Sequence, residues 1–422
     1  MSKRGPRRSE DGPRSRRNGS RAERVAAGGH APGAELPYYH LTEFAATVGG
    51  MALRVVSKPG VEAWDHVSRS THLLADAAQP APNARVLVLG CGHGAGGVSL
   101  AMRAPSAQVL LFDFNVTALA MAERTARANG VSNVEISYEP WPAPEETGHV
   151  DLVVMEAPPN RGLARRWLLE ARRVLREHGR LLLAGPNDAG IQSAIDDARE
   201  LFGAATILGY KAKHRIAHAV NGFIMAAPAW TSEPGIAPGT VARFEVTAGS
   251  RVLDLQSLPG VFAHGKLDEG TRVLLEHLVV PAGGRVLDVG CGYGIIGTIA
   301  ALEGAAHVDL IDSNLLAVAS TRLNLEALNI TNARVLASDA LAAVVDERYD
   351  LIVTNPPFHA GKAITYAAAN TFIEHARHLL QPGGTFVLVA NRFIRYDQLM
   401  RSVFKQVDVV AETRAFRVLR GQ

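Results

Sequence analysis

The residues Asn355-Pro-Pro-Phe358 have the chemistry to hold a planar amine. Two consecutive prolines force an extended, rigid backbone and supply carbonyl groups without an intervening amide donor. The side-chain oxygen of Asn355 and the carbonyl of Pro356 can then both accept hydrogen bonds from an exocyclic amine, while Phe358 stacks on the ring that carries it. Held in this way, the nitrogen lone pair faces an electrophilic methyl group. We therefore expect Asn355, Pro356 and Phe358 to be catalytic; the alternative is an ordinary Pro-Pro turn with a buried phenylalanine.

A glycine-rich turn precedes this segment in the chain. Gly290-Cys-Gly-Tyr-Gly294 follows an apolar, β-rich run and opens a helical pattern. Glycines let the backbone turn tightly and approach a ligand at a helix N-terminus, so Gly290, Gly292 and Gly294 are candidates for cofactor binding. Flavin, NAD and S-adenosylmethionine proteins all use such a turn. The spacing GxGxG disfavours NAD, whose enzymes typically have GxGxxG.

Three aspartates lie at or near the ends of predicted strands. Asp312 could accept hydrogen bonds from both ribose hydroxyls, Asp339 could accept the adenine amino proton, and Asp288 could face the amino group of a methionine moiety. Each of them taken singly could instead be a helix cap or a solvated loop acid. Together with the glycine turn and with Asn355, which we also expect to contact the cofactor, they predict that S-adenosylmethionine is bound.

Longer segments around these residues resemble one family. Asn355-Pro-Pro-Phe-His-Ala-Gly361 is similar to the motif of bacterial rRNA guanine-N2 methyltransferases of the RsmC/RlmG type. Leu258-Pro-Gly-Val-Phe-Ala-His-Gly-Lys-Leu-Asp268 resembles the segment before that family's catalytic core. Val389-Ala-Asn-Arg-Phe-Ile-Arg-Tyr396, after Gly383-Gly384, resembles its later strand and loop. The resemblance covers roughly residues 36–422 and is strongest from Leu258 onward.

This resemblance implies methylation of the 2-amino group of a guanine in ribosomal RNA, with 16S rRNA favoured. It also implies that Phe262, Lys266, Pro357 and His359 lie at the rim of the cofactor or substrate pocket. A packed phenylalanine and a solvated lysine are equally compatible with the first two residues. The target base must leave its stack to reach the reactive site, which costs least in an unpaired segment. Free rRNA or a small-subunit particle is therefore the expected partner.

Alternating strands and helices are expected to position these residues. Apolar β-rich runs alternate with segments of helical period, as a parallel sheet covered by helices requires. In the second half this pattern predicts strands at 285–290, 307–311, 333–337, 350–354 and 384–390, helices at 295–303, 315–328 and 364–380, and an antiparallel pair at 407–410 and 415–419. The predicted fold class is α/β, with two tandem doubly wound Rossmann-like class I methyltransferase domains, the N-terminal one degenerate.

An internal repeat is the basis for predicting two domains. Arg85–Gly94 and Arg285–Gly294 differ at three of ten positions and lie 200 residues apart. Three further pairs of segments keep this register: 112–115 with 311–314, 151–154 with 350–353, and 179–183 with 384–388. We expect a basic tail at 1–35, a first domain at 36–229, a Pro/Gly/Ser-rich linker at 230–240 and a catalytic domain at 241–422.

The first half lacks the reactive residues of the second. Aligning the paired prolines of the two halves places Ala157 opposite Asn355 and Asn160 opposite Phe358, and Val88 answers Asp288. In the resembling family the first half is a degenerate copy that supports folding and RNA binding, and these losses agree with that. The first half nevertheless keeps its glycines and one acid, so cofactor binding there stays open; the kept residues are Gly90, Gly92, Gly94 and Asp113.

Composition restricts the class of protein. Apolar residues make up 47% of the 422 positions, which suffices for two cores. Because no apolar run is long enough for a membrane span or a secretory signal, we expect a cytoplasmic protein without a membrane partner. Two cysteines in separate turns and scattered histidines predict no metal, and we expect a monomer. Nine Lys/Arg and four Asp/Glu in residues 1–35 predict a disordered tail that either binds RNA phosphates or is dispensable.

Two other functions stay open from the sequence. Asn-Pro-Pro followed by an aromatic residue also suits methyl transfer to a protein glutamine or a DNA adenine, although Phe358-His359 and the tandem halves favour guanine. A non-catalytic RNA-binding assembly factor could keep the same fold. The intact glycine turn together with Asn355 argues against that interpretation.

Overall fold

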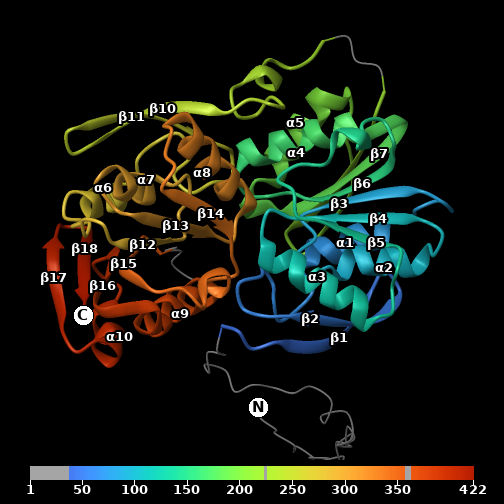
Figure 1. Cartoon of the computed structure of the whole chain (residues 1–422). Helices are drawn as coiled ribbons and strands as arrows, with labels where there is room; N and C mark the ends of the chain where they lie inside the picture. The colour runs from blue at the N-terminus through green and yellow to red at the C-terminus, as the bar shows by residue number, and fades with distance from the viewer. Residues whose placement is uncertain (1–37, 223–225, 357–362) are drawn as a thin grey trace, which may run out of the picture. The chain divides into compact units, whose positions relative to one another are not determined.

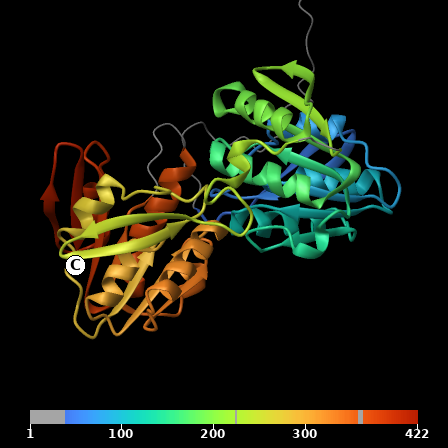
Figure 2. The same cartoon turned by 90° about the horizontal axis from the view of Figure 1, so that it is seen from above.

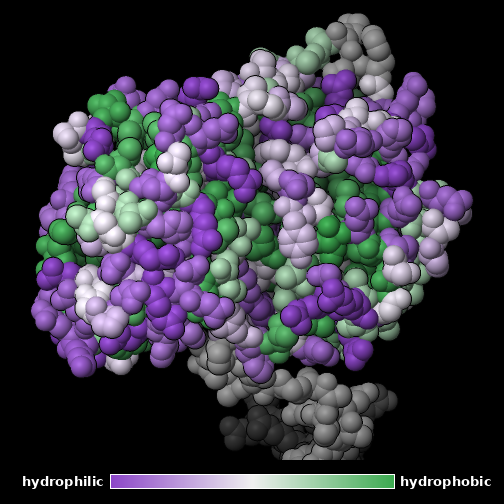
Figure 3. Space-filling view, viewed as in Figure 1, coloured by the Kyte–Doolittle hydropathy of each residue, from purple (hydrophilic) through white to green (hydrophobic). Residues whose placement is uncertain are grey.

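Two seven-stranded sheets, each surrounded by helices, make up the described part of the chain (Figure 1). The computed structural model describes residues 38–222, 226–356 and 363–422, with side chains described from residue 368 in the helix that starts at Ala363. Leu36–Gln422 form one compact unit. The predicted α/β class with two Rossmann-like halves is confirmed. In the view of Figure 3 the outer face over the second half is largely hydrophilic.

The second half opens with a hairpin and a short helix, β10 (Ala242–Ala248), β11 (Arg251–Ser257) and α6 (Glu269–Leu275). Its sheet has the order β14-β13-β12-β15-β16-β18-β17, parallel through β16 and antiparallel at β18 and β17. The strands are β12 (Arg285–Val289), β13 (His307–Asp312), β14 (Ala333–Ala337), β15 (Tyr349–Thr354), β16 (Leu380–Asn391), β17 (Val407–Glu412) and β18 (Phe416–Gly421). The helices are α7 (Ile295–Leu302), α8 (Leu315–Ala327), α9 (Ala363–Leu379) and α10 (Tyr396–Val403), with a 3-10 turn at Ala342–Val344.

The first half repeats this arrangement, with the strand order β5-β4-β3-β6-β7-β9-β8 and its own leading hairpin. Its strands are β1 (Thr42–Val48), β2 (Met51–Ser57), β3 (Arg85–Leu89), β4 (Gln108–Phe112), β5 (Val134–Ser137), β6 (Val150–Glu156), β7 (Leu175–Pro186), β8 (Thr206–Lys211) and β9 (His214–Val220). Its helices are α1 (Arg69–Ala77), α2 (Ala95–Arg103), α3 (Val116–Ala128), α4 (Arg161–Val174) and α5 (Ile191–Phe202), with 3-10 turns at Pro144–Glu146, Asn187–Ala189 and Ala229–Ser232.

Local sequence accounts for the elements that border the reactive edge. The last four residues of β12 are buried, as in a strand covered on both faces. Gly294 has a φ of 88°, which glycine adopts without strain, and α7 starts from it. Asn314 caps α8 by accepting a hydrogen bond from the backbone of Leu316 at 2.9 Å. The hairpin β10–β11 lies along α8 (Figure 2), where Asn324 bonds both backbone groups of Gln256.

All the strands and helices predicted for the second half are present, within four residues at their ends. The hairpin β10–β11 and the helices α6 and α10 were not predicted. The hairpin has an alternating pattern on both sides of Gly249-Ser250, which is a recognisable signal. The segment 230–240, predicted as a linker, is packed: Trp230 is buried and donates to Glu200 at 3.0 Å, and Ala237 accepts from Arg166 at 3.0 Å.

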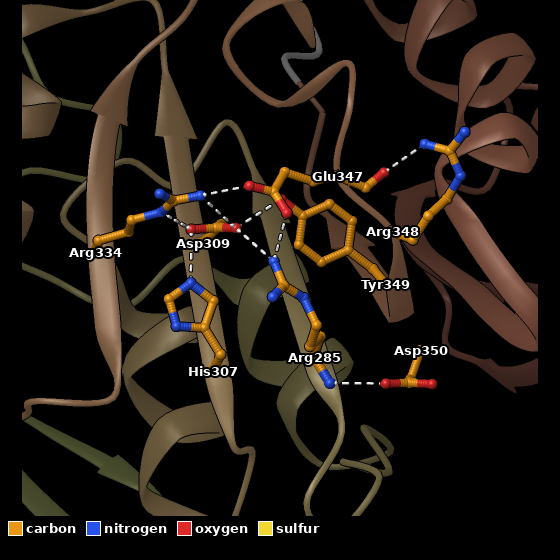
Figure 4. A network of polar contacts seen from close by, with 8 residues as sticks. All are labelled: Arg285, His307, Asp309, Arg334, Glu347, Arg348, Tyr349 and Asp350. Atoms are coloured by element: carbon orange, nitrogen blue, oxygen red, sulfur yellow. Dashed lines mark hydrogen bonds and ion pairs between the residues drawn. The ribbon is translucent and has the colours of Figure 1, made fainter.

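A polar network closes the edge of the second sheet where its strands begin (Figure 4). The buried carboxylate of Asp309 accepts hydrogen bonds from Arg334 and, at 2.6 Å, from Tyr349, and lies 3.0 Å from the ring of His307. Burial raises the pKa of Asp309, but these partners outweigh burial and hold the pKa below its ordinary value. In the first half Val150 stands where Tyr349 lies, and a hollow of about 310 Å³ opens there. The network therefore fills space that a smaller side chain leaves open.

The two halves meet through their equivalent turns after β4 and β13. Asn115 and Asn314 form an antiparallel bridge, Val116 donates to the carbonyl of Ser313 at 2.9 Å, and Leu315 donates to that of Phe114 at 2.7 Å.

Among the residues that the structure describes, no helix is long and apolar enough to cross a membrane, and no cluster of His, Cys, Asp or Glu could hold a metal ion.

Candidate functional site

The predicted site residues gather where β12, β13 and β15 end. Gly290 follows β12, Asp312 is the last residue of β13, and Asn355 follows β15. The chain order of the strands reverses between β12 and β15, and ligands of open α/β sheets bind at such a switch point, outside the carboxyl ends of the strands. The topology therefore brings together residues that lie up to 65 positions apart in the chain.

Asn355 is held by two residues of the α6 region. Its side-chain nitrogen donates to Asp268 at 3.1 Å and to the hydroxyl of Thr271 at 2.7 Å. Asp268 is itself fixed, because its carboxylate caps α6 by accepting from the backbone of Thr271 at 2.9 Å. The side-chain oxygen of Asn355 is buried and has no hydrogen-bond partner among the described residues. Since a buried acceptor without a partner costs about 1–3 kcal/mol, this oxygen is suited to a donor that a ligand brings.

The glycine turn leaves open space in front of β12. Gly290 and Gly292 have φ values of 71° and 60°, and a Cβ atom on either would meet nothing within 4 Å. Gly294, in contrast, backs onto Thr321, whose side chain would lie 2.7 Å from such a Cβ. The first two glycines thus form a cradle that a ligand can enter, and the third allows close packing between α7 and α8.

Two carboxylates flank this cradle, of which Asp312 is half-buried and Asp288 is fully buried. Asp312 accepts hydrogen bonds from the backbone of Gly292 at 2.9 Å and of Asn314 at 2.8 Å, but burial outweighs them and raises its pKa to about 6. Asp288 is fully buried; one oxygen accepts from Gly297 at 2.8 Å and the other has no partner among the described residues. Burial raises the pKa of Asp288 to about 7. A buried carboxylate with a free oxygen suits the ammonium group of S-adenosylmethionine, so the residues present fit that cofactor.

Asp339 faces the first half of the chain. One of its oxygens accepts from Tyr38 at 2.7 Å and from Thr117 at 2.9 Å, and the other pairs with the buried amine of Lys58 at 2.7 Å. Lys58 also lies over the ring of Tyr38, 3.8 Å from its centroid. The predicted contact between Asp339 and adenine stays a prediction. What the structure adds is that this carboxylate joins the loop after β14 to the first half.

The other predicted residues fall into two groups. Phe262 is 53% exposed, and Lys266 is also exposed, while its carbonyl accepts from Tyr293 at 3.1 Å. Both are available to a ligand, and their role stays a prediction. Pro356 is buried beside Asn355. Pro357, Phe358 and His359 lie outside the described residues.

Sequence reasoning missed Asp268 and Thr271. Both lie more than 80 positions before Asn355, so no local spacing joins them to it. The available signal was an aspartate three residues before a threonine at the start of a helix, which is typical of a capping residue. Asp268 is also the last residue of the segment 258–268, which resembles the family, and it contacts Asn355 from outside the Asn-Pro-Pro motif.

The alignment of the two halves by their paired prolines was wrong by one residue. In the sheets Leu89 pairs with Met155, and its counterpart Val289 pairs with Thr354. The residue equivalent to Asn355 is therefore Glu156 and not Ala157. The pairing of Asn160 with Phe358 stays a prediction, since Phe358 lies outside the described residues. The strand β6 is one residue longer than β15, which shifts the prolines.

Glu156 makes contacts that mirror those of Asn355. Its carboxylate accepts from the hydroxyls of Ser68 and Thr71, each at 3.0 Å, and these residues correspond to Asp268 and Thr271. Both halves therefore have three polar side chains in the same arrangement. The residue after the strand donates in the second half (Asn355) and accepts in the first (Glu156). An anion now stands where the second half presents an amide, and burial raises the pKa of Glu156 to about 7.

Trp167 fills the space in the first half that is open in the second. A Cβ atom on Gly90 would come within 3.3 Å of the ring of Trp167, and this side chain is buried. Phe114 packs against the indole with 6.1 Å between ring centroids. The glycines and Asp113 are retained, and Asp113 still accepts from the backbone of Gly92 at 3.0 Å. At Gly90 the retained turn therefore borders a side chain, whereas a Cβ atom on Gly92 would still meet nothing within 4 Å.

We expect Glu156→Gln to stabilise the protein above pH 7. The folded-state pKa of about 7 exceeds the ordinary value of 4.5, so folding binds a proton and the unfolding free energy falls as the pH rises between these values. Glutamine removes this loss. The substitution should raise the free energy of unfolding by about 1–2 kcal/mol at pH 8 and by little at pH 4.5. This gain is smaller than the pKa shift of Glu156 alone would give, because the side chain is only partly buried.

Urea unfolding of Glu156→Gln and of the wild type from pH 4.5 to 8 measures this difference. Glu139→Gln, an exposed position in the same half, is the matched control and should give a constant offset. A Glu156→Gln curve parallel to that of the wild type would show that the carboxylate is already ionised in the folded protein.

Comparisons with family models and with curated relatives indicate the same family of methyltransferases. The model of the methyltransferase small domain family matches residues 52–218 and again 252–420. The chain is 37% identical over 284 residues to ribosomal RNA small subunit methyltransferase C of Chromohalobacter salexigens, covering 66% of this chain and 80% of the relative. It is 32% identical over 315 residues to the protein of that name in Shewanella pealeana, covering 70% of this chain and 89% of the relative.

One solved structure has a similar fold over nearly the whole chain. It is that of the T. thermophilus 16S rRNA N2 methyltransferase RsmC in complex with AdoMet and guanosine. The superposition has a TM-score of 0.76 at 30% sequence identity and covers 92% of this chain and 98% of that chain.

Proposed function

Since this chain belongs to the methyltransferase small domain family and to the ribosomal RNA small subunit methyltransferase C group, we propose that it methylates the 2-amino group of a guanine in 16S rRNA. The methyl donor is S-adenosylmethionine. The observation that carries the proposal is the buried side-chain oxygen of Asn355, which has no partner among the described residues while its nitrogen is held by Asp268 and Thr271. An amide held in this orientation offers an acceptor and cannot easily turn its donor toward the substrate.

Asn355 would bind and orient the guanine amine. Its side-chain oxygen accepts one N–H of the exocyclic amine, and the carbonyl of Pro356 can accept the other. When bound, S-adenosylmethionine supplies an electrophilic methyl group on a sulfonium. The nitrogen can lose its proton as it gains positive charge, so the protein contributes mainly alignment of the two groups. Phe358 is proposed to stack on the guanine ring.

The cofactor is proposed to lie in the cradle at Gly290 and Gly292. Asp288 would hold the methionine ammonium with its free oxygen, and Asp312 would accept from the ribose hydroxyls beyond the hydrogen bonds that it already makes. Gly294 closes the packing behind the turn. Adenine would lie farther along the edge, toward the loop of Asp339, with Phe262, Lys266, Pro357 and His359 at the rim.

Labelled methyl transfer tests the proposed substrate directly. The protein is incubated with labelled S-adenosylmethionine and, separately, undermodified 16S rRNA, undermodified 23S rRNA, duplex DNA and a release factor. N2-methylguanosine in 16S rRNA supports the proposal, and free rRNA compared with small-subunit particles shows which form is preferred. Label in protein or DNA alone overturns it.

The cytoplasm is the proposed site of action because rRNA and the methyl donor meet there, and we propose a monomer.

We expect one cofactor per chain, bound in the second half. Gly292→Ala should weaken S-adenosylmethionine binding about 10-fold, because its methyl group would project into the open cradle. Gly92→Ala is a closely matched control: its φ of 53° is near the 60° of Gly292, so the backbone strain is similar. Titration calorimetry should find unchanged affinity for Gly92→Ala. Two sites per wild-type chain, or equal losses in both variants, would show that the first half binds the cofactor.

A further inference from the structure

A basic hollow of about 870 Å³ lies at the same end of the second sheet as Asn355. The end of β16, the loop before α10 and the turn between β17 and β18 form its walls. Four arginines line it together with one aromatic residue: Arg392, Arg395, Arg414, Arg417 and Phe393. None of these residues takes part in the cofactor site or in the contacts of Asn355.

The charge of this basic hollow is only partly compensated. Glu412 accepts from Arg392 at 2.8 Å and from Arg417 at 3.1 Å, and Asp397 accepts from Arg395 at 3.1 Å. Arg414 is exposed and has no ion pair among the described residues. The hollow thus has four guanidinium groups and two carboxylates to balance their charge. The carboxylates form ion pairs with three of the four guanidinium groups. Such an arrangement favours a ligand with more than one anionic group.

Phe393 is the feature that selects among anionic ligands. Its side chain is 68% exposed and lies between Arg392 and the turn that leads to Arg395. A large exposed aromatic side chain among cations does not contribute to the core. Bases stack on such rings, and guanidinium groups bind the phosphates beside them.

The basic hollow adjoins the reactive residues through two contacts. Asn391, which lines it, pairs with Phe416 across β16 and β18. A Cβ atom on Gly270 would lie 3.1 Å both from the ring of Phe416 and from the carboxylate of Asp268. Since Asp268 holds the amide of Asn355, the hollow is linked to the proposed acceptor through Phe416, Gly270 and Asp268.

We propose that this basic hollow binds the RNA strand next to the target guanine, with phosphates on the arginines and an unstacked base on Phe393. The inference rests on the proposed function, because it takes the substrate to be RNA. The target guanine has to leave its stack, and a single strand beside it is held by a stacking ring flanked by cations. An acidic peptide would use the arginines but would leave Phe393 without a partner.

Two variants test the proposal without disturbing the core. Arg414→Ala should weaken binding of undermodified 16S rRNA about 3- to 10-fold and reduce the slope of log K against log salt by about 0.7 to 0.9. Phe393→Ala should weaken binding about 5- to 100-fold with an unchanged salt slope, and Phe393→Trp should restore it. Arg348→Ala removes an exposed arginine at the opposite edge of the sheet and should leave both quantities unchanged.

The measurements use the full chain, saturated with S-adenosylmethionine, in a filter-binding titration at several salt concentrations. Calorimetric titration of the same variants with S-adenosylmethionine should give the wild-type affinity, which shows that the fold and the cofactor site are intact. If the wild type binds and methylates rRNA and both variants match it, the hollow is not the RNA site. If the wild type does not bind rRNA while cofactor binds normally, the proposed function itself fails. An acidic peptide that competes with rRNA equally for the wild type and Phe393→Ala would also overturn the stacking role.

Discussion

Asn355→Ala is expected to reduce the rate of methyl transfer to undermodified 16S rRNA about 100- to 1000-fold while leaving cofactor affinity within about 3-fold. The variant removes the buried oxygen that has no partner within the described residues, which is the proposed acceptor for the guanine amine. Because alignment acts mainly in the transition state, the loss should fall on kcat rather than on the KM for RNA. Single-turnover transfer with nucleoside analysis measures it.

Two results would contradict this assignment of Asn355. N2-methylguanosine formed at the wild-type rate would show that the amide does not take part. A loss of cofactor binding that equals the loss of transfer would show that Asn355 belongs to the cofactor pocket instead. Glu156→Ala removes the equivalent side chain of the first half and is the matched control, for which the wild-type rate is expected.

Asp268→Asn is expected to lower kcat about 10- to 100-fold with no change in cofactor affinity or in folding stability. Asparagine still caps α6 through its oxygen, since it is as good an N-cap as aspartate. The same side-chain oxygen accepts from the backbone of Thr271 and from the side-chain nitrogen of Asn355. In asparagine that oxygen is uncharged, so it holds the nitrogen of Asn355 less firmly and the amide can turn. Asp268 is therefore a positioning residue.

A double-mutant cycle distinguishes positioning from a purely structural role. If Asp268 acts through Asn355, the variant Asp268→Asn/Asn355→Ala should be no slower than Asn355→Ala alone. Additive losses would mean that Asp268 contributes by another route. Ser68→Ala, at the position of Asp268 in the first half, should keep the wild-type kcat.

Local patterns in the sequence were sufficient to predict the strands of the second seven-stranded sheet, its glycine turn and the position of Asn355 at its edge. Each of these depends on neighbours within about ten residues: an apolar run, a spacing of glycines, a pair of prolines. The repeat then extended the prediction to a second domain. The placement of Asp288, Asp312 and Asn355 at one edge followed from topology, because parallel strands all end on the same side.

Contacts between distant segments could not be predicted in the same way. The hydrogen bond from Asn355 to Asp268 joins residues 87 positions apart, and that from Tyr38 to Asp339 joins residues 301 positions apart. The error of one residue at Ala157 has a similar cause. Paired prolines fix the backbone locally, but strand register against β3 decides which side chain reaches the site, and register depends on the whole sheet.

Trp167 makes the two halves respond differently to the supply of methyl donor. Its indole lies against Gly90, at the position that corresponds to the open side of Gly290. If the first half binds no cofactor, as we propose, its free energy does not depend on cofactor concentration. A second half that binds the cofactor at the proposed site gains stability in proportion to the logarithm of cofactor concentration once this exceeds the dissociation constant, about 1.4 kcal/mol for each further tenfold rise. When the cofactor is scarce, the half that carries out the reaction is the more sensitive of the two to unfolding and proteolysis.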